Sequence, residues 1–183
     1  MNLISQLING LNVGSIYALI ALGYTMVYGI AKMLNFAHGD VIMVGAYTVY
    51  VAINNLGWPP IVAVVFGIFV CAVLGVTIEK VAYKPLRKAS PLAVLITAIG
   101  VSYLLQSLSL LIFGSKQIPF KSIIHLDPVQ IGGLKISGEA VVTLATTVII
   151  MIALTLFINK TKAGKAMLAV SEDRAAAELM GVN

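Results

Sequence analysis

The residues of this 183-residue chain that could do chemistry are few, and most of them gather in one short polar segment. Asn35, His38 and Asp40 fall within six residues, between two long runs without Asp, Glu, Lys or Arg. An imidazole and a carboxylate this close could relay a proton or contact a polar solute. One histidine and one aspartate are too few for a metal site, so we predict no metal ligands here.

The sequence contains no recognisable catalytic motif. Gly164-Lys165 is followed by Ala166, and Asn159 occupies the upstream glycine position of a phosphate-binding loop, so that pattern fails. Zinc-protease and serine-hydrolase patterns are missing, and the single cysteine, Cys71, supports neither a disulfide framework nor a Cys-based metal site. We therefore predict that the chain is not an enzyme and binds no cofactor itself.

The composition indicates which elements must position these residues. Hydrophobic residues make up 60% of the chain and charged residues only 10%, against about 25% charged in a typical soluble domain. Four runs contain no charged residue, and each is at least as long as the roughly 20 residues that cross a bilayer. The runs are 3–31, 41–78, 90–115 and 140–159. The sequence predicts an all-α integral membrane protein, a polytopic helical bundle in a single domain over 1–183.

The second run is too long for one helix, and it breaks where Gly57 and the tandem Pro59-Pro60 mark a turn. About five transmembrane helices result. The second span is short for a crossing, so we expect it to be tilted, broken or partly buried by protein. The spans are 9–31, 41–56, 60–79, 91–113 and 140–158.

Lysines and arginines predict the orientation. If the spans alternate, nine of the twelve lie on one side, at Lys32, in the loop 79–89 and in the segment 160–183. The positive-inside rule makes that side cytoplasmic, with the N-terminus outside. Basic residues arranged in this way fit contact with membrane lipid, and we predict no nucleic-acid partner.

The outer loop 115–139 contains a predicted hairpin. Val129–Ile131 and Leu134–Ile136 flank Gly132-Gly133, which is typical of a two-residue turn. The loop could be part of a docking face for an external partner, or a lid over the helix ends.

Small residues recur at every fourth position in two spans, a spacing that lets helix backbones approach closely in lipid. Such a stripe could border a transport pathway or serve plain helix packing. The stripes are Gly10, Gly14 and Ala18 in the first span, and Gly67, Cys71 and Gly75 in the third.

The polar segment between the first two spans has two interpretations that its residues leave open. Ionisable groups at membrane depth usually face a bundle interior or a water-filled cavity, which favours a pathway element. Alternatively, the segment is a cytoplasmic connection in which Asp40 caps the next helix. The remaining carboxylates lie at or beyond span ends, which favours a passive channel or a subunit powered elsewhere over an ion-coupled carrier.

The segment 160–183 is polar and Ala-rich, and it predicts two short helices along the cytoplasmic face. Ser171, followed by Glu172 and Asp173, offers the start of the second helix, and Gly181 its C-terminal cap. Without Trp or Phe the segment is a weak lipid anchor, so a groove in a partner protein is favoured.

Several blocks of the sequence resemble the permeases of branched-chain amino acid ABC transporters, above all the smaller of the two permeases that pair in such importers. The resemblance covers essentially all 183 residues, and with Asn35, His38 and Asp40 we include Gly45 among the predicted pathway residues. The blocks are Asn35-Phe36-Ala37-His38-Gly39, Val44-Gly45-Ala46-Tyr47, Ala82-Tyr83-Lys84-Pro85-Leu86-Arg87, Thr97-Ala98-Ile99-Gly100-Val101 and the tail from Gly164 to Asn183.

The resemblance implies a set of partners and a location. The partners are a second homologous permease, two cytosolic ATPases that use ATP and magnesium, and an extracytoplasmic substrate-binding protein. The location is a bacterial or archaeal plasma membrane. Permeases of this kind continue for further spans, so five spans are an incomplete bundle.

The resemblance also implies that 171–181 is the coupling helix seated in an ATPase groove. Ala175 stands where the importer motif has an acidic residue, and Leu168 where a second basic residue is common. Glu178 or one of the acidic residues before the motif would then replace the acidic member. The predicted coupling residues are Gly164, Glu172, Asp173, Ala176, Ala177 and Gly181.

Import of branched-chain amino acids is thus the leading functional hypothesis. Close relatives of such permeases carry urea or short amides, which is one alternative. From a different class, the small-residue stripes suit a small self-assembling channel or membrane scaffold without ATPase partners.

Overall fold

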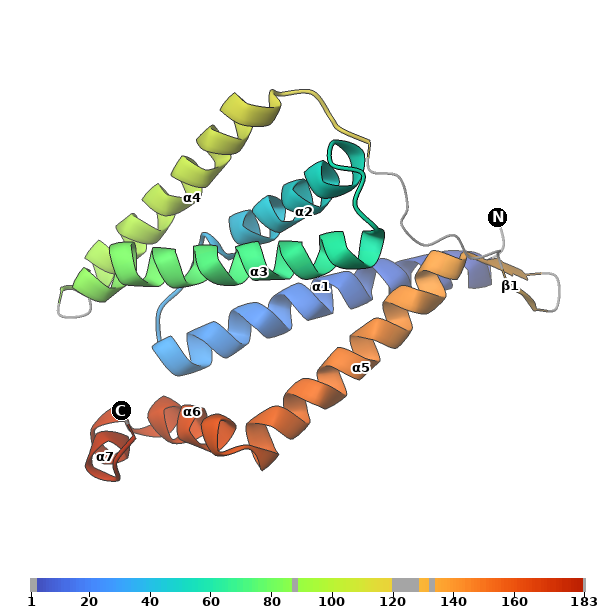
Figure 1. Cartoon of the computed structure of the whole chain (residues 1–183). Helices are drawn as coiled ribbons and strands as arrows, with labels where there is room; N and C mark the ends of the chain where they lie inside the picture. The colour runs from blue at the N-terminus through green and yellow to red at the C-terminus, as the bar shows by residue number, and fades with distance from the viewer. Residues whose placement is uncertain (1–2, 87–88, 120–128, 132–133, 183) are drawn as a thin grey trace. The chain divides into compact units, whose positions relative to one another are not determined.

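The computed structural model describes residues 3–86, 89–119, 129–131 and 134–182. The chain divides into two compact units, Met1–Lys32 with Ile124–Asn183, and Met33–Ile123. The first unit contains α1 (Leu3–Ala31), β1 (Val129–Ile131), β2 (Leu134–Ile136), α5 (Gly138–Lys160), α6 (Lys162–Glu172) and α7 (Arg174–Leu179) (Figure 1). The second contains α2 (His38–Asn54), α3 (Pro60–Ile78), a π-helical turn (Glu79–Tyr83), a 3-10 turn (Lys84–Leu86) and α4 (Pro91–Phe113).

The predicted all-α membrane architecture is confirmed. Within the described residues, α1, α3, α4 and α5 are long and apolar enough to cross a membrane. The second predicted span, 41–56, corresponds to α2, a helix of 17 residues that is short for a crossing, as its sequence predicts. The first helix begins at Leu3 rather than at residue 9.

The ends of the helices in the second unit follow from local chemistry. α3 and α4 each begin with a proline, whose missing N–H costs nothing at the first helical position. Ser90 caps α4, since its side-chain oxygen accepts a hydrogen bond from the N–H of Ala93. α4 ends at Gly114, whose φ of 78° is open to glycine and turns the chain sharply.

α2 and α3 lie side by side and antiparallel, along a seam of small residues (Figure 1). A Cβ on Gly67 would lie 2.7 Å from Val49 Cγ2, and one on Gly45 would collide with Cys71 Sγ. The Cys71 thiol donates a hydrogen bond of 3.4 Å to the carbonyl of Val41. The buried hydrophobic core of the unit consists of Ala37, Ile78, Tyr83, Ala98 and Leu105.

The predicted small-residue stripes differ in what they contact. Gly67 and Cys71 pack on α2, whereas no atom lies within 4 Å of a Cβ placed on Gly75, apart from its own helix backbone and chain neighbours. The same is true of Gly10 and Gly14, and Ala18 is exposed on the same helix. The α1 stripe therefore makes no helix contact within the described residues, and its packing stays a prediction.

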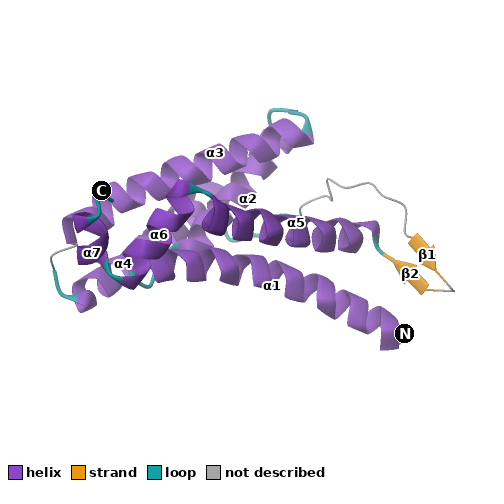
Figure 2. Cartoon of the chain, turned by 90° about the horizontal axis from the view of Figure 1, so that it is seen from below, coloured by secondary structure: helices purple, strands orange, loops and turns teal. Residues whose placement is uncertain are grey.

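In the first unit, α1 and α5 lie side by side, and the predicted hairpin is present as strands β1 and β2 (Figure 2). Val129 pairs with Ile136 and Ile131 with Leu134, in antiparallel register. The predicted Gly132-Gly133 turn lies outside the described residues, as do residues 120–128 of the loop 115–139.

The two short helices predicted after the last span are present as α6 and α7. Thr161 caps α6 by accepting a hydrogen bond from the N–H of Gly164 at 2.9 Å. Gly164 itself lies against the backbone of Phe157 and Ile158, where a Cβ would collide. Glycine at this position permits the sharp corner between α5 and α6.

The start of α7 corrects the prediction, because Asp173 caps it and Ser171 does not. Asp173 Oδ1 accepts hydrogen bonds from the N–H groups of Ala175 and Ala176, at 2.9 and 3.1 Å. The carboxylate satisfies two free amides at once and also suits the positive end of the helix dipole. The predicted cap at Gly181 is confirmed. Its φ is 86°, and the N–H groups of Gly181 and Val182 bond back to the carbonyls of Glu178 and Ala177.

Candidate functional site

The polar segment before α2 folds into a tight turn centred on Asn35. Asn35 Oδ1 accepts hydrogen bonds from the N–H of Ala37 at 3.1 Å and from the hydroxyl of Tyr83 at 2.7 Å. Its carbonyl accepts the N–H of His38 at 3.2 Å. Asn35 thus ties the start of α2 to the π-helical turn that follows α3. Irregular backbone at membrane depth requires such cover by protein.

Asp40 is the buried carboxylate of the second unit, with 8% of its surface exposed. Its two oxygens accept hydrogen bonds from Ser102 Oγ at 2.5 Å and from Gln106 Nε2 at 3.0 Å. Gln106 Nε2 also donates to Ser102 Oγ at 3.1 Å, which closes a triangle between α2 and α4. The N-cap of α2 is Ala37, so the predicted capping of this helix by Asp40 is wrong, and the interpretation of the segment as a cytoplasmic connection stays a prediction.

The partners of Asp40 place the start of α2 half-way along α4. Ser102 lies 11 residues after Pro91, or roughly 16 Å along the helix axis. Further on, the rings of Tyr47 and Phe113 stack, with centroids 4.0 Å apart, so α2 and α4 run in the same direction. α2 therefore accompanies the second half of α4, and its first turn lies near the middle of a helix long enough to cross a bilayer.

The four residues predicted to line a pathway lie in one unit but in different surroundings. Asn35 and Asp40 make the polar contacts described above. His38 is the first residue of α2 and is half-buried. Gly45 is buried in the seam against Cys71. Their role along a pathway stays a prediction.

Three side chains complete this hydrogen-bonded cluster and were not predicted as site residues: Tyr83, Ser102 and Gln106. A signal for the last two was present, because Ser102 and Gln106 stand four residues apart, on one face of a charge-free helix. Tyr83 gave no comparable signal, since its link to Asn35 spans 48 residues of sequence.

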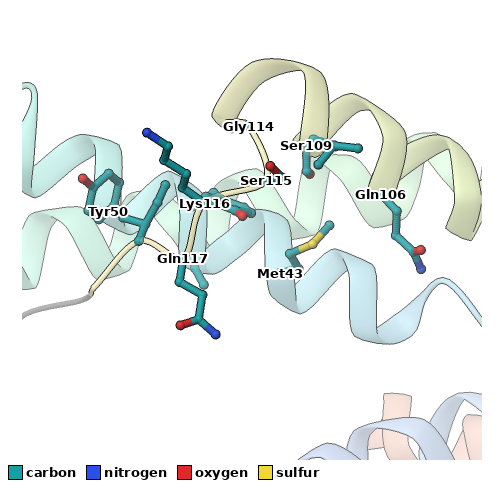
Figure 3. A pocket seen from close by; sticks show the side chains of 12 residues that line it. Met43, Tyr50, Gln106, Ser109, Gly114, Ser115, Lys116 and Gln117 are labelled. Carbon is teal, nitrogen blue, oxygen red and sulfur yellow. The ribbon is translucent and has the colours of Figure 1, made fainter.

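A cavity of about 570 Å³ adjoins the cluster, formed by α2, the end of α4 and the segment after Gly114 (Figure 3). Gln106 belongs to both features, because it lines the cavity and donates to Asp40. The cavity therefore lies next to the buried carboxylate, with one amide side chain common to both.

The predicted coupling residues lie in the first unit. Gly164 is buried at the corner before α6, and Asp173 is an exposed cap. Ala177 is 4% exposed, whereas the adjacent Leu179 and Met180 are 89% and 85% exposed. Glu172, Ala176 and Gly181 are exposed. The end of α7 therefore presents two large apolar side chains that nothing covers within the described residues.

Comparison with known proteins places this chain in a family. Residues 6–183 match the family described as the permease component of the branched-chain amino acid transport system. The chain belongs to this family. The match extends over both units, including α2 with its buried carboxylate and the paired helices α6 and α7.

Individual family members agree with this assignment. The chain is 41% identical to the high-affinity branched-chain amino acid transport system permease protein BraD of Pseudomonas aeruginosa, and 39% identical to the corresponding protein LivH of Escherichia coli K12. A probable branched-chain amino acid transport permease of Methanocaldococcus jannaschii is 29% identical over 92% of the chain. The two bacterial alignments cover 98% of this chain and 62% of each relative, so the chain spans less than two thirds of their length. No solved structure is significantly similar to this family member.

Proposed function

We propose that the chain is part of the membrane-spanning permease of an ATP-driven importer of branched-chain amino acids. The family membership and four apolar helices support this proposal. The observation that carries it is the buried Asp40, held by Ser102 and Gln106 half-way along α4. A charged group at such a depth is costly and usually faces a solute pathway.

The segment before α2 belongs to this pathway. Asn35, His38, Asp40 and Gly45 border the route of the solute, and α2 is a helix that begins inside the bundle. Discontinuous helices with termini near the membrane midplane are a common way to present polar groups to a solute. Few charges and mainly apolar walls suit substrates with aliphatic side chains.

The two units belong to one permease domain, since the family match runs through both. The N-terminus lies outside, and the segment 160–183 lies in the cytoplasm. α2 supports this orientation because it runs parallel to α4 and antiparallel to α3, so the direction of the chain alternates from α2 to α4 as predicted.

α7 and its flanks form the coupling segment for a cytosolic ATPase. The exposed Leu179 and Met180 are the side chains that would enter a groove on that partner. The complete assembly contains a second permease, two ATPases that bind ATP and magnesium, and an external substrate-binding protein. Hydrolysis of ATP takes place in the ATPases, and this chain is not itself an enzyme.

The test is uptake by the complete transporter in proteoliposomes, with labelled leucine and labelled urea supplied in parallel. We expect ATP-dependent accumulation of leucine and none of urea. Accumulation of urea alone would assign a different substrate class. Leucine flux through this chain without the ATPases would instead show a channel and overturn the proposal.

A further inference from the structure

The cavity beside Gln106 is bounded by the turn that ends α4. Gly114 ends α4 with its positive φ, and the chain then folds back so that Lys116 and Ile118 line the same cavity as Tyr50 near the end of α2. Two of its walls are α2 and α4, which contact each other through the stacked rings of Tyr47 and Phe113. Under the orientation proposed above, the cavity opens at the outer end of the bundle.

The lining of this cavity is mainly apolar, with polar side chains spread along its length. Met43, Ala46 and Leu110 contribute apolar side chains, and Ser109 and Ser115 lie between the two ends (Figure 3). Figure 3 shows Tyr50 and Lys116 at one end and Gln106 at the other. Among the described residues that line it, Lys116 is the one charged group, so the outer end favours an anion.

We propose that this cavity is an outer substrate site for an aliphatic α-amino acid. The carboxylate of the substrate pairs with Lys116, and its side chain lies on the apolar wall. A lipid acyl chain fits less well, because it has no anionic group to pair with Lys116. The proposal rests on the proposed function and adds to it a location and a mode of recognition.

Gln106 gives the site an exit toward Asp40. Its amide nitrogen donates to Asp40 Oδ1, and the ammonium group of an amino acid is a donor of the same kind and carries a charge. A rotation of Gln106 away from Asp40 lets the substrate ammonium take over this hydrogen bond. The Asp40 carboxylate then accepts the same number of hydrogen bonds before and after the exchange. It is therefore never buried without a donor.

The experiment is substrate protection of an introduced cysteine in the complete transporter, without the binding protein, so that only free leucine reaches the cavity. Cys71 is the single cysteine of the chain and is first replaced by serine. Ser115→Cys then places a thiol in the cavity lining, and Asn55→Cys places one on the exposed end of α2 outside it. Both variants are labelled with a water-soluble thiol reagent, with and without leucine.

We expect leucine at ten times its Kd to slow the labelling of Ser115→Cys about tenfold by mass action and to leave Asn55→Cys unchanged. Leucinol, which lacks the carboxylate, should protect less well than leucine. In a Lys116→Met background the advantage of leucine over leucinol should disappear, with leucine bound about two- to fivefold more weakly.

Three results would overturn the outer substrate site. In the first, leucine changes neither labelling rate. In the second, it slows both variants equally, which indicates a general change of conformation. In the third, Ser115→Cys resists labelling even without leucine, which indicates that another segment or a lipid fills the cavity. Leucine uptake by the unmodified transporter is measured separately, and its absence would overturn the proposed function instead.

Discussion

At the scale of single residues, the chemistry of the second unit depends on a few polar side chains that hydrogen-bond to one another. Asp40 has two donors, and Asn35 Oδ1 has two. A buried acceptor that loses its donors, or a donor left behind, costs about 1–3 kcal/mol. These residues therefore contribute both to stability and, under the proposed function, to the passage of a solute.

Replacement of Asp40 should separate the two contributions. Asp40→Ala removes the acceptor of the Ser102 hydroxyl and one of the two acceptors of Gln106 Nε2, and should lower the Tm of the purified transporter by about 3–8 °C. Combining it with Ser102→Ala and Gln106→Leu should recover part of this loss, because no buried polar group is then orphaned. Transport should stay low in the triple variant. Recovery of transport together with Tm would assign Asp40 a purely structural role.

Asn35 allows a similar test at the turn. Asn35→Leu keeps the branching of the side chain at Cγ but cannot accept from Tyr83 or Ala37, and we expect uptake to fall by more than the amount of assembled transporter. Tyr83→Phe serves as the comparison, because it removes one hydrogen bond and leaves the turn intact. Quantitative blotting beside uptake measures both effects. An equal loss of uptake and assembly in Asn35→Leu would point to folding alone.

At the scale of elements, the α2–α3 seam fixes where α2 lies. Gly67 and Gly45 let the two helices approach until a Cβ would collide with the opposite helix. In a bilayer such close contact has to supply the stability that the hydrophobic effect gives in water. The small residues of this seam therefore set how closely α2 lies against α3.

The two glycines of α3 make a matched pair for testing this seam. Gly67→Val inserts a side chain into Val49 and should destabilise the protein by about 1–3 kcal/mol. Gly75→Val makes the same change where no atom of another element lies within 4 Å, and we expect little effect. Thermal unfolding in detergent reports both. A larger loss for Gly75→Val would mean that this face is covered in the assembled transporter.

Local sequence signals accounted for most helix ends, because each is decided within a few residues. Pro60, Pro91 and Gly181 stand where helices begin or end, and charge-free runs marked the long helices. The start of α7 was misplaced because Ser171 and Asp173 compete as caps two residues apart. The depth of α2 was not predictable in this way, since it depends on pairing between Asp40 and Ser102 at a distance of 62 residues.

At the scale of the whole molecule, the proposed function makes the exposed end of α7 the point at which an ATPase partner acts on this chain. Asp173 at its start and the hydrogen bonds around Gly181 at its end hold this six-residue helix in shape. So short a helix is unstable by itself, and such caps matter more for it than for a long one. Its last residue, Leu179, and the following Met180 are the two large apolar side chains exposed at this end.

Gly181 gives the corresponding prediction for assembly. Gly181→Val forces a β-branched residue into a left-handed conformation and should weaken association with the ATPases, while membrane insertion stays normal. Gly181→Asn, which tolerates this conformation, should retain association. Ala176→Arg, on the exposed surface of α7, should also weaken it. Co-purification from mild detergent measures each variant, and unchanged ATPase recovery with both Gly181→Val and Ala176→Arg would remove α7 from the interface.

The link between Asp40 and Ser102 also has a consequence for biosynthesis. Ser102 is made 62 residues after Asp40, which at 5–20 residues per second is a delay of roughly 3–12 s. During this time α2 carries an aspartate whose transfer to the bilayer centre costs about 2.5–3.5 kcal/mol. We expect the nascent α2 to wait at the membrane surface or inside the translocon until α4 arrives. The order in which the helices are made would then differ from the order in which they enter the membrane.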